Sequence, residues 1–173
     1  VRGVLLFSPA SLSDDLYRYL WEGRVVALGG NPYLHPPADP TWAALADDPI
    51  RLLVNHPDVP AVYPPLALLG FSLLARLHYG PLAVKLTMGL ADLATTWALG
   101  RVLQERRRSL DGAWLYALLP LGAVETAGSG HLEGIAVASL ALALLAWQRG
   151  RSGLGWAGLG ALVKLLPIAV LPV

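Results

Sequence analysis

Apolar residues dominate the later part of the chain, where they form a series of long runs separated by short polar breaks. The runs cover residues 61–77, 82–103, 112–127, 132–148 and 153–173. A helix that crosses a bilayer needs about 20 predominantly apolar residues, with a range of roughly 17–25. The pattern therefore predicts an all-α fold, a polytopic integral membrane helical bundle over residues 61–173.

Residues 1–60 follow a different pattern, because they are polar and rich in proline and aromatic side chains. The segment Ser11–Asp14 fits the capping-box pattern, and Gly29–Pro32 is a typical stop signal. These signals predict a helix over about residues 14–28, whose apolar and aromatic positions recur at helical spacing. We expect an amphipathic interfacial helix within an extracytoplasmic loop, with its aromatic residues Tyr17 and Trp21 as anchors in the headgroup layer.

Composition narrows the class of protein further. The chain has 173 residues, of which 55% are hydrophobic and 14% charged, and it has no cysteine. Disulfide scaffolds and cysteine-ligated metal sites are therefore excluded. With 13 basic residues against 12 acidic ones, there is no field to attract phosphates, so we predict no nucleic-acid partner. The apolar sequence at both ends leads us to expect a fragment of a larger polytopic protein.

The arginines predict an orientation in the membrane. The break at 105–108 carries consecutive arginines, and 149–151 carries another pair. Loops rich in Lys and Arg stay on the cytoplasmic side, which places 1–60 and the turn 128–134 outside. In this topology the run 61–77 does not cross the bilayer. If it does cross, the loop 1–60 shares a side with the arginines, against the rule.

Asp14 and Asp15 form the most conspicuous candidate for chemistry. A sugar hydroxyl is a poor nucleophile until a carboxylate accepts its proton, and a carboxylate pair above a membrane is placed for that task. The alternative is that both aspartates only complement the dipole of the helix that they begin. Helical spacing alone favours this alternative.

A set of short motifs in this sequence resembles one family of membrane enzymes. The motifs are Ser13–Tyr19, Trp21–Arg24, Gly30–Tyr33, Val54–Pro57, Tyr63–Leu66, Gly128–Glu133 and Leu162–Pro167. Taken in order, they resemble the GT-C type polyprenyl-phosphate-sugar-dependent glycosyltransferases of bacteria, often described as mannosyltransferases. The resemblance extends over nearly the whole chain.

The resemblance implies a multi-pass cell-membrane enzyme that transfers a sugar, mannose by family precedent, from a polyprenyl-phosphate donor to a glycan or glycolipid acceptor. Transfer takes place at the extracytoplasmic face with inversion, and Asp14 or Asp15 acts as the general base. Substrate-binding candidates complete the site: Arg18, Arg24, Tyr63, His131, Glu133 and Lys164. No cofactor and no metal is expected, although the aspartate pair is also suited to recruit a divalent cation.

Several of these candidates have a structural alternative. Arg18 and Arg24 offer planar forks for a phosphate, but Arg18 is also spaced for an ion pair with Asp14 or Glu22. His131 and Glu133, together with Glu125, are equally typical of a solvated turn. Tyr63 precedes two prolines that fix the entry into the next run.

A different class of protein remains possible on the same sequence. Asp92 lies deep within an apolar run, where an ionisable group is costly and suggests either function or a buried pair. Lys85 and Lys164 are its candidate partners. The alternative function is therefore a membrane transporter or lipid flippase fragment with an intramembrane Lys/Asp charge relay.

Overall fold

The computed structural model describes residues 1–10, 12–165 and 167, and within these residues it is helical without strands, which confirms the all-α class. The α-helices are α1 (Arg2–Leu6), α2 (Asp15–Ala27), α3 (Pro65–Leu77), α4 (Pro81–Glu105), α5 (Asp111–Leu118), α6 (Pro120–Ala123), α7 (Glu133–Gln148) and α8 (Leu154–Val163). The 3-10 helices η1 (Pro40–Leu45) and η2 (Arg51–Leu53) lie between α2 and α3, and a π-helical turn, η3 (Val124–Gly128), precedes α7.

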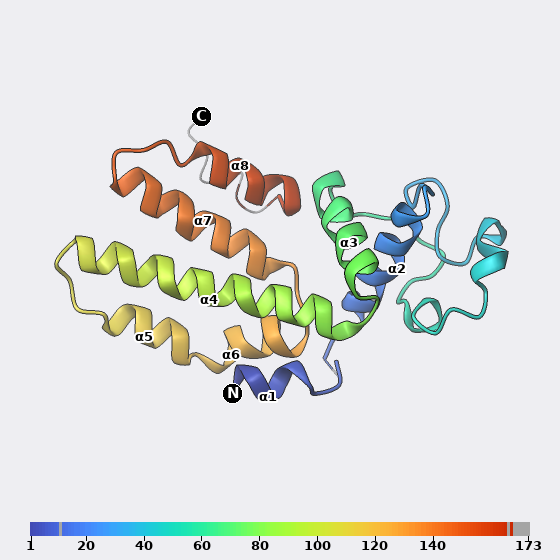
Figure 1. Cartoon of the computed structure of the whole chain (residues 1–173), viewed down its shortest axis with the longest axis horizontal. Coiled ribbons are helices and arrows are strands. Elements are labelled where there is room, and N and C mark those ends of the chain that lie inside the picture. The colour runs from blue at the N-terminus through green and yellow to red at the C-terminus, as the bar shows by residue number, and fades with distance from the viewer. Residues whose placement is uncertain (11, 166, 168–173) are drawn as a thin grey trace.

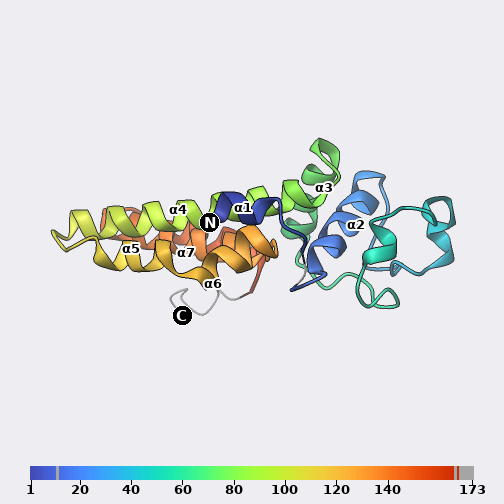
Figure 2. The same cartoon turned by 90° about the horizontal axis from the view of Figure 1, so that it is seen from below.

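The molecule is elongated and has two parts (Figures 1 and 2). In one part α4 packs along α7, with α5 beside α4 and α8 beside α7. In the other part α2 packs on α3, next to the irregular segment that contains η1 and η2. The α4–α5 and α7–α8 connections lie at the end of the molecule opposite to this segment. In the first turn of α7, Ile135 packs against the core cluster that includes Leu16 of α2 and Phe71 of α3.

Helix α2 has the predicted bounds but not the predicted environment. It ends before Gly29, whose φ of +83° is a backbone conformation that favours glycine. Trp21 is not a headgroup anchor, because its side chain is buried and meets the edge of Trp42 at a ring distance of 6.4 Å. Most faces of α2 are covered by its neighbours, so this helix is part of the core.

The crossing of α2 and α3 is unusually close because of one glycine. A Cβ atom on Gly23 would lie 2.3 Å from the backbone oxygen of Phe71 in α3. Next to this crossing the Tyr19 ring stacks on the Phe71 ring, with centroids 4.6 Å apart. Small and aromatic residues thus lock α2 in place, and α2 carries the aspartate pair at its start.

Some predicted runs differ from the observed helices. The run 112–127 is divided into α5, α6 and η3, because Pro120 cannot continue a helix and instead begins a new one. In the run 153–173, α8 covers Leu154–Val163, and residues 166 and 168–173 lie outside the described part of the chain. Among the described helices, none combines the length with the apolar character that a membrane crossing requires.

Candidate functional site

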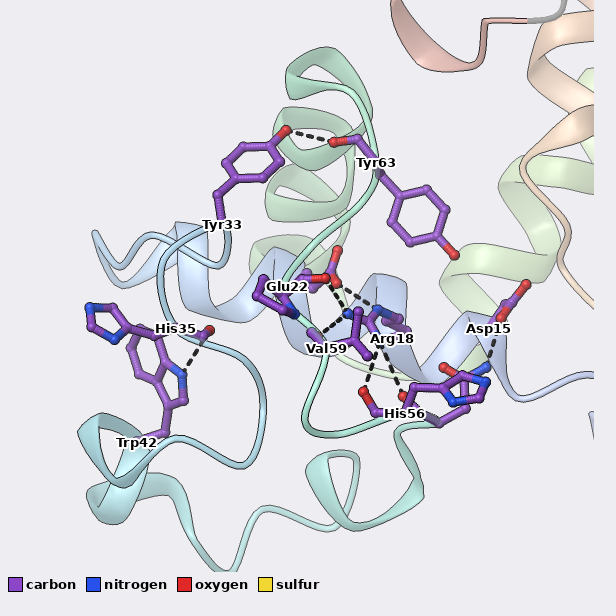
Figure 3. A network of polar contacts seen from close by, with 11 residues as sticks. Asp15, Arg18, Glu22, Tyr33, His35, Trp42, His56, Val59 and Tyr63 are labelled. Atoms are coloured by element: carbon purple, nitrogen blue, oxygen red, sulfur yellow. Dashed lines mark hydrogen bonds and ion pairs between the residues drawn. The ribbon is translucent and has the colours of Figure 1, made fainter.

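The two aspartates at the start of α2 are in different environments, and Figure 3 shows that of Asp15. Asp14 is exposed at the N-cap position, and its side chain makes no capping hydrogen bond. Asp15 is half-buried in the first turn, and its Oδ1 accepts a hydrogen bond from Nδ2 of Asn55 at 2.8 Å. Among the contacts of the described residues, only Asp15 is therefore held in a fixed position by another part of the chain.

Two tyrosines lie beside Asp15. The rings of Tyr19 and Tyr63 meet edge to face with centroids 5.0 Å apart. Burial raises the pKa of the Tyr19 hydroxyl, and the nearby Tyr63, Asp15 and Glu133 raise it further. Burial and then the Asp15 carboxylate raise the pKa of Tyr63. Both hydroxyls therefore keep their protons and remain hydrogen-bond donors.

The turn before α7 brings further candidate residues to the same region. Gly130 has a φ of +74°, and a Cβ atom there would lie 3.6 Å from Cβ of Leu16 in α2. This close approach sets the turn against the start of α2. Within the turn His131 pairs with Glu125, and Glu133 pairs with Lys164, which follows α8.

Arg18 does not have the predicted free guanidinium. Its Nε donates to Glu22 at 2.8 Å, and its other N–H groups donate to the backbone oxygens of Asn55, His56, Val59 and Pro60. Because a guanidinium has five N–H donors, none is left for a phosphate. The structural alternative, an ion pair with Glu22, is correct, and Arg18 fixes the 55–60 segment against α2 (Figure 3).

Arg24 is remote from the aspartates. It lies about 14 Å further along the α2 axis than Asp15, at roughly 1.5 Å per residue. Its Nε pairs with Asp48 at 3.3 Å, and its guanidinium covers the Tyr79 ring at 4.7 Å from the centroid. The structure therefore places Arg24 in a contact between α2, the η1–η2 segment and the α3–α4 connection, not beside Asp15.

Asp92, Lys85 and Lys164 do not form the charge relay predicted for a transporter or lipid flippase. Asp92 is buried, and it accepts hydrogen bonds from Nε of Arg2 at 2.5 Å and from the Tyr116 hydroxyl at 2.8 Å. Lys85 instead donates to the backbone oxygens of Leu5 in α1 and of Ser8 after it. Lys164 pairs with Glu133. Arg2 in α1 is thus the counter-ion of Asp92.

Glu22 is the most perturbed carboxyl group of α2. Burial raises its pKa to about 7, against the opposing effect of Arg18, and its Oε2 has no hydrogen-bond partner within the described residues. The folded state thus holds a proton that the unfolded state releases at lower pH. Because the folded state binds more protons in this window, stability falls as pH rises from the ordinary glutamate value towards about 7.

We expect Glu22→Gln to remove this dependence. Between pH 5 and pH 7 the wild-type protein should lose on the order of 2 kcal/mol of unfolding free energy that the variant keeps. Denaturant titration at each pH measures the difference. Glu105→Gln is the control, because the hydrogen bond with Arg149 lowers the pKa of Glu105. In this variant the fall of the unfolding free energy between pH 5 and pH 7 should therefore remain. Equal slopes in wild type and Glu22→Gln would contradict the assignment.

Asp15, the tyrosines Tyr19 and Tyr63, and the Glu133–Lys164 pair lie in one region, where α2, the 55–63 segment and the start of α7 converge. A fixed carboxylate beside protonated hydroxyls suits a group transfer that needs a base. A family model described as "Alpha-(1->6)-mannopyranosyltransferase, N-terminal domain" matches residues 4–173. The chain belongs to this family, and the predicted resemblance to mannosyltransferase-like glycosyltransferases is confirmed. No curated protein and no solved structure gives a significant match.

Sequence reasoning missed the residues that fix the site in place. Asn55 was part of a quoted motif, but only the fold reveals that it reaches Asp15 across a separation of 40 residues. Tyr19 likewise lies within one of the motifs, but only the fold reveals that its ring packs against Tyr63 beside Asp15. Among the described residues, no cluster of three or more His, Asp or Glu side chains is arranged to hold a metal ion.

Proposed function

We propose that this chain forms the acceptor-activating part of a membrane mannosyltransferase that uses a polyprenyl-phosphate-mannose donor. Family membership establishes a glycosyltransferase of mannose type. The donor, the inverting course and the base are the proposed steps. Asp15, rather than Asp14, is the base, and the acceptor is a hydroxyl of a glycan or glycolipid.

The observation that carries this proposal is the fixed position of Asp15. A general base must keep one oxygen free towards the proton that it accepts, while the group as a whole is oriented. Asn55 occupies Oδ1 of Asp15, and Oδ2 makes no hydrogen bond to the described residues. Asp14 has no comparable support, which favours its alternative role at the helix dipole.

The proposed reaction is a single displacement. The acceptor oxygen forms a bond to the anomeric carbon of mannose while the bond from that carbon to the donor phosphate oxygen breaks. Oδ2 of Asp15 takes the proton of the acceptor hydroxyl, and the electron pair of the broken bond leaves with the polyprenyl phosphate. Attack from the face opposite the leaving group inverts the anomeric centre.

The polar groups around Asp15 are suited to bind the donor. Lys164 and Glu133 form a partly exposed pair, so a phosphate or a sugar hydroxyl can compete for either member. His131 lies in the same turn, paired with Glu125. Tyr63 offers a hydroxyl whose raised pKa keeps it a donor for sugar oxygens. We keep these residues as substrate-binding candidates and withdraw Arg18 and Arg24.

Exposed apolar side chains support the proposed multi-pass membrane location. Leu86, Leu90, Leu93 and Trp97 are all exposed and recur at helical spacing, which makes one apolar stripe along α4. A stripe of this kind on a surface calls for a lipid or protein environment. The arginines after α4 and α7 lie at the end opposite to the η1–η2 segment, which favours an extracytoplasmic site.

Donor exchange in membranes that contain the full-length protein tests the proposal. We expect mannose transfer from a polyprenyl-phosphate-mannose donor and none from a nucleotide-linked mannose when lipid carrier is absent. The product should have the anomeric configuration opposite to that of the donor, which NMR of the purified product determines. Equal use of the nucleotide donor, or retention of configuration, would contradict the proposed reaction.

A further inference from the structure

We propose that Asn55 is a positioning residue for the Asp15 base, and that Arg18 acts through Asn55 by fixing the 55–60 segment. This inference rests on the proposed function. It assigns to the Asn55–Pro60 segment the orientation of the reacting carboxylate, a role that neither the family description nor the motif resemblance gives it.

The contact between Asn55 and Asp15 sets the direction of the carboxylate. Nδ2 of Asn55 donates to Oδ1 of Asp15 at 2.8 Å, and the backbone N–H of Asp15 donates to Oγ of Ser13 at 3.3 Å. An amide donor orients a carboxylate without placing a positive charge beside it. With Oδ1 held, Oδ2 is the oxygen available for a substrate hydroxyl.

The Asn55 segment depends on Arg18 for its conformation. His56 has a φ of +46°, in the left-handed region that is unfavourable for residues other than glycine. The backbone oxygens of Asn55 and His56 each accept a hydrogen bond from Nη1 of Arg18 at 3.2 Å. Nη2 of the same side chain binds the backbone oxygens of Val59 and Pro60.

One side chain therefore fixes both ends of this turn (Figure 3). Arg18 lies one helical turn after Asp15 on α2, so the same helix carries the base and the group that supports its partner. Glu22 in turn fixes the Arg18 guanidinium through Nε. Hydrogen bonds thus connect Arg18 of α2 to the 55–60 segment, and Asn55 of that segment to Asp15 of the same helix.

The nearest charged groups to Asp15 along the chain are Asp14 and Arg18, and further titratable groups surround it. Tyr19 and Tyr63 face it from α2 and from the segment before α3, and burial raises the pKa of both. Glu133 lies beyond Tyr19 at the start of α7, where it pairs with Lys164. His56 follows Asn55 in the same turn. A substitution at Asn55 leaves the chemical identity of all these groups unchanged.

Asn55→Asp in the full-length enzyme is the decisive variant. It replaces the amide by a carboxyl group of the same shape, and two carboxylates in hydrogen-bond contact cannot both ionise freely. We expect the acidic limb of the kcat/KM pH profile to move upward by about one to two pH units. Asn31→Asp is the matched control, because Asn31 is exposed and contacts the Tyr33 backbone instead of Asp15.

Asn55→Ala separates positioning from binding. Because a small misplacement of a reacting group costs roughly 100-fold in rate, we expect kcat to fall by about 10- to 100-fold while the donor KM changes less than about threefold. Thermal unfolding of the purified variants in detergent confirms that each one folds. A merely structural asparagine would lower the unfolding temperature without moving the pH profile.

The outcomes distinguish this inference from the proposed function. A pH profile of Asn55→Asp that superimposes on wild type, or moves no further than that of Asn31→Asp, overturns the positioning role. If Asp15→Asn is inactive in the same assay, Asp15 remains the base and only the inference fails. If Asp15→Asn is fully active, both the proposed base and the role of Asn55 are wrong.

Discussion

Gly23→Ala is expected to lower the free energy of unfolding by about 3 kcal/mol or more, at the upper end of the usual cost of overpacking. The added Cβ atom would lie 2.3 Å from the backbone oxygen and 2.4 Å from the backbone carbon of Phe71. Backbone atoms cannot rotate away as a flexible side chain can, so α2 and α3 must move apart. Chemical denaturation of the full-length protein in detergent measures the loss.

Gly70→Ala on the partner helix is the matched control. A Cβ atom on Gly70 meets nothing within 4 Å, and alanine is favoured over glycine within a helix by about 1 kcal/mol. The control should therefore be neutral or slightly stabilising. A similar effect of the two substitutions would contradict the close crossing of α2 and α3 at Gly23.

Gly23→Ala should also disturb the site around Asp15. The Tyr19 ring stacks on Phe71, and the Tyr63 ring meets Phe71 edge to face at 5.7 Å. A shift of α3 away from α2 therefore moves both tyrosines relative to Asp15. This link explains how a glycine in the middle of α2 contributes to a site at its beginning.

Local signals predicted α2 well because they depend on neighbouring residues alone. The stop signal at Gly29–Pro32 and the capping pattern before Asp15 limit the helix to within a residue or two of its observed bounds. The environment of α2 depends on distant residues and was not predictable in this way. Trp21 is buried because η1 brings Trp42 against it, a contact that helical spacing does not encode.

The sequence predicted which residues belong to the candidate site better than it predicted what each of them does. The motifs identified Asp15, Tyr63 and Glu133, which the fold brings to one region. For Arg18 the sequence left two roles open, and four backbone oxygens from the 55–60 segment decide between them. The pairing of Arg2 with Asp92 spans 90 residues and left no pattern in the sequence.

Asp15→Asn is expected to reduce mannose transfer by the full-length enzyme by about 10²- to 10⁴-fold, which is the usual contribution of a general base. Asparagine keeps the shape of the side chain, and its oxygen can still accept the hydrogen bond from Asn55. What it loses is the ability to take a proton from the acceptor. The fold and the donor affinity should therefore stay close to those of the wild type.

Asp14→Asn provides the comparison within the same helix turn. Asp14 is exposed and lacks a side-chain capping bond, so its contribution is limited to the helix dipole, typically 0.3–1 kcal/mol. We expect the transfer rate of this variant to remain within a few fold of wild type. The two neighbouring substitutions thus have the same chemistry and opposite expected results.

The rate of mannose transfer by Asp15→Asn and Asp14→Asn, measured side by side at saturating donor, tests the central claim most directly. The account predicts a loss of at least about 100-fold for Asp15→Asn, with Asp14→Asn nearly as active as the wild type. Normal transfer by Asp15→Asn, or a larger loss for Asp14→Asn, would contradict it.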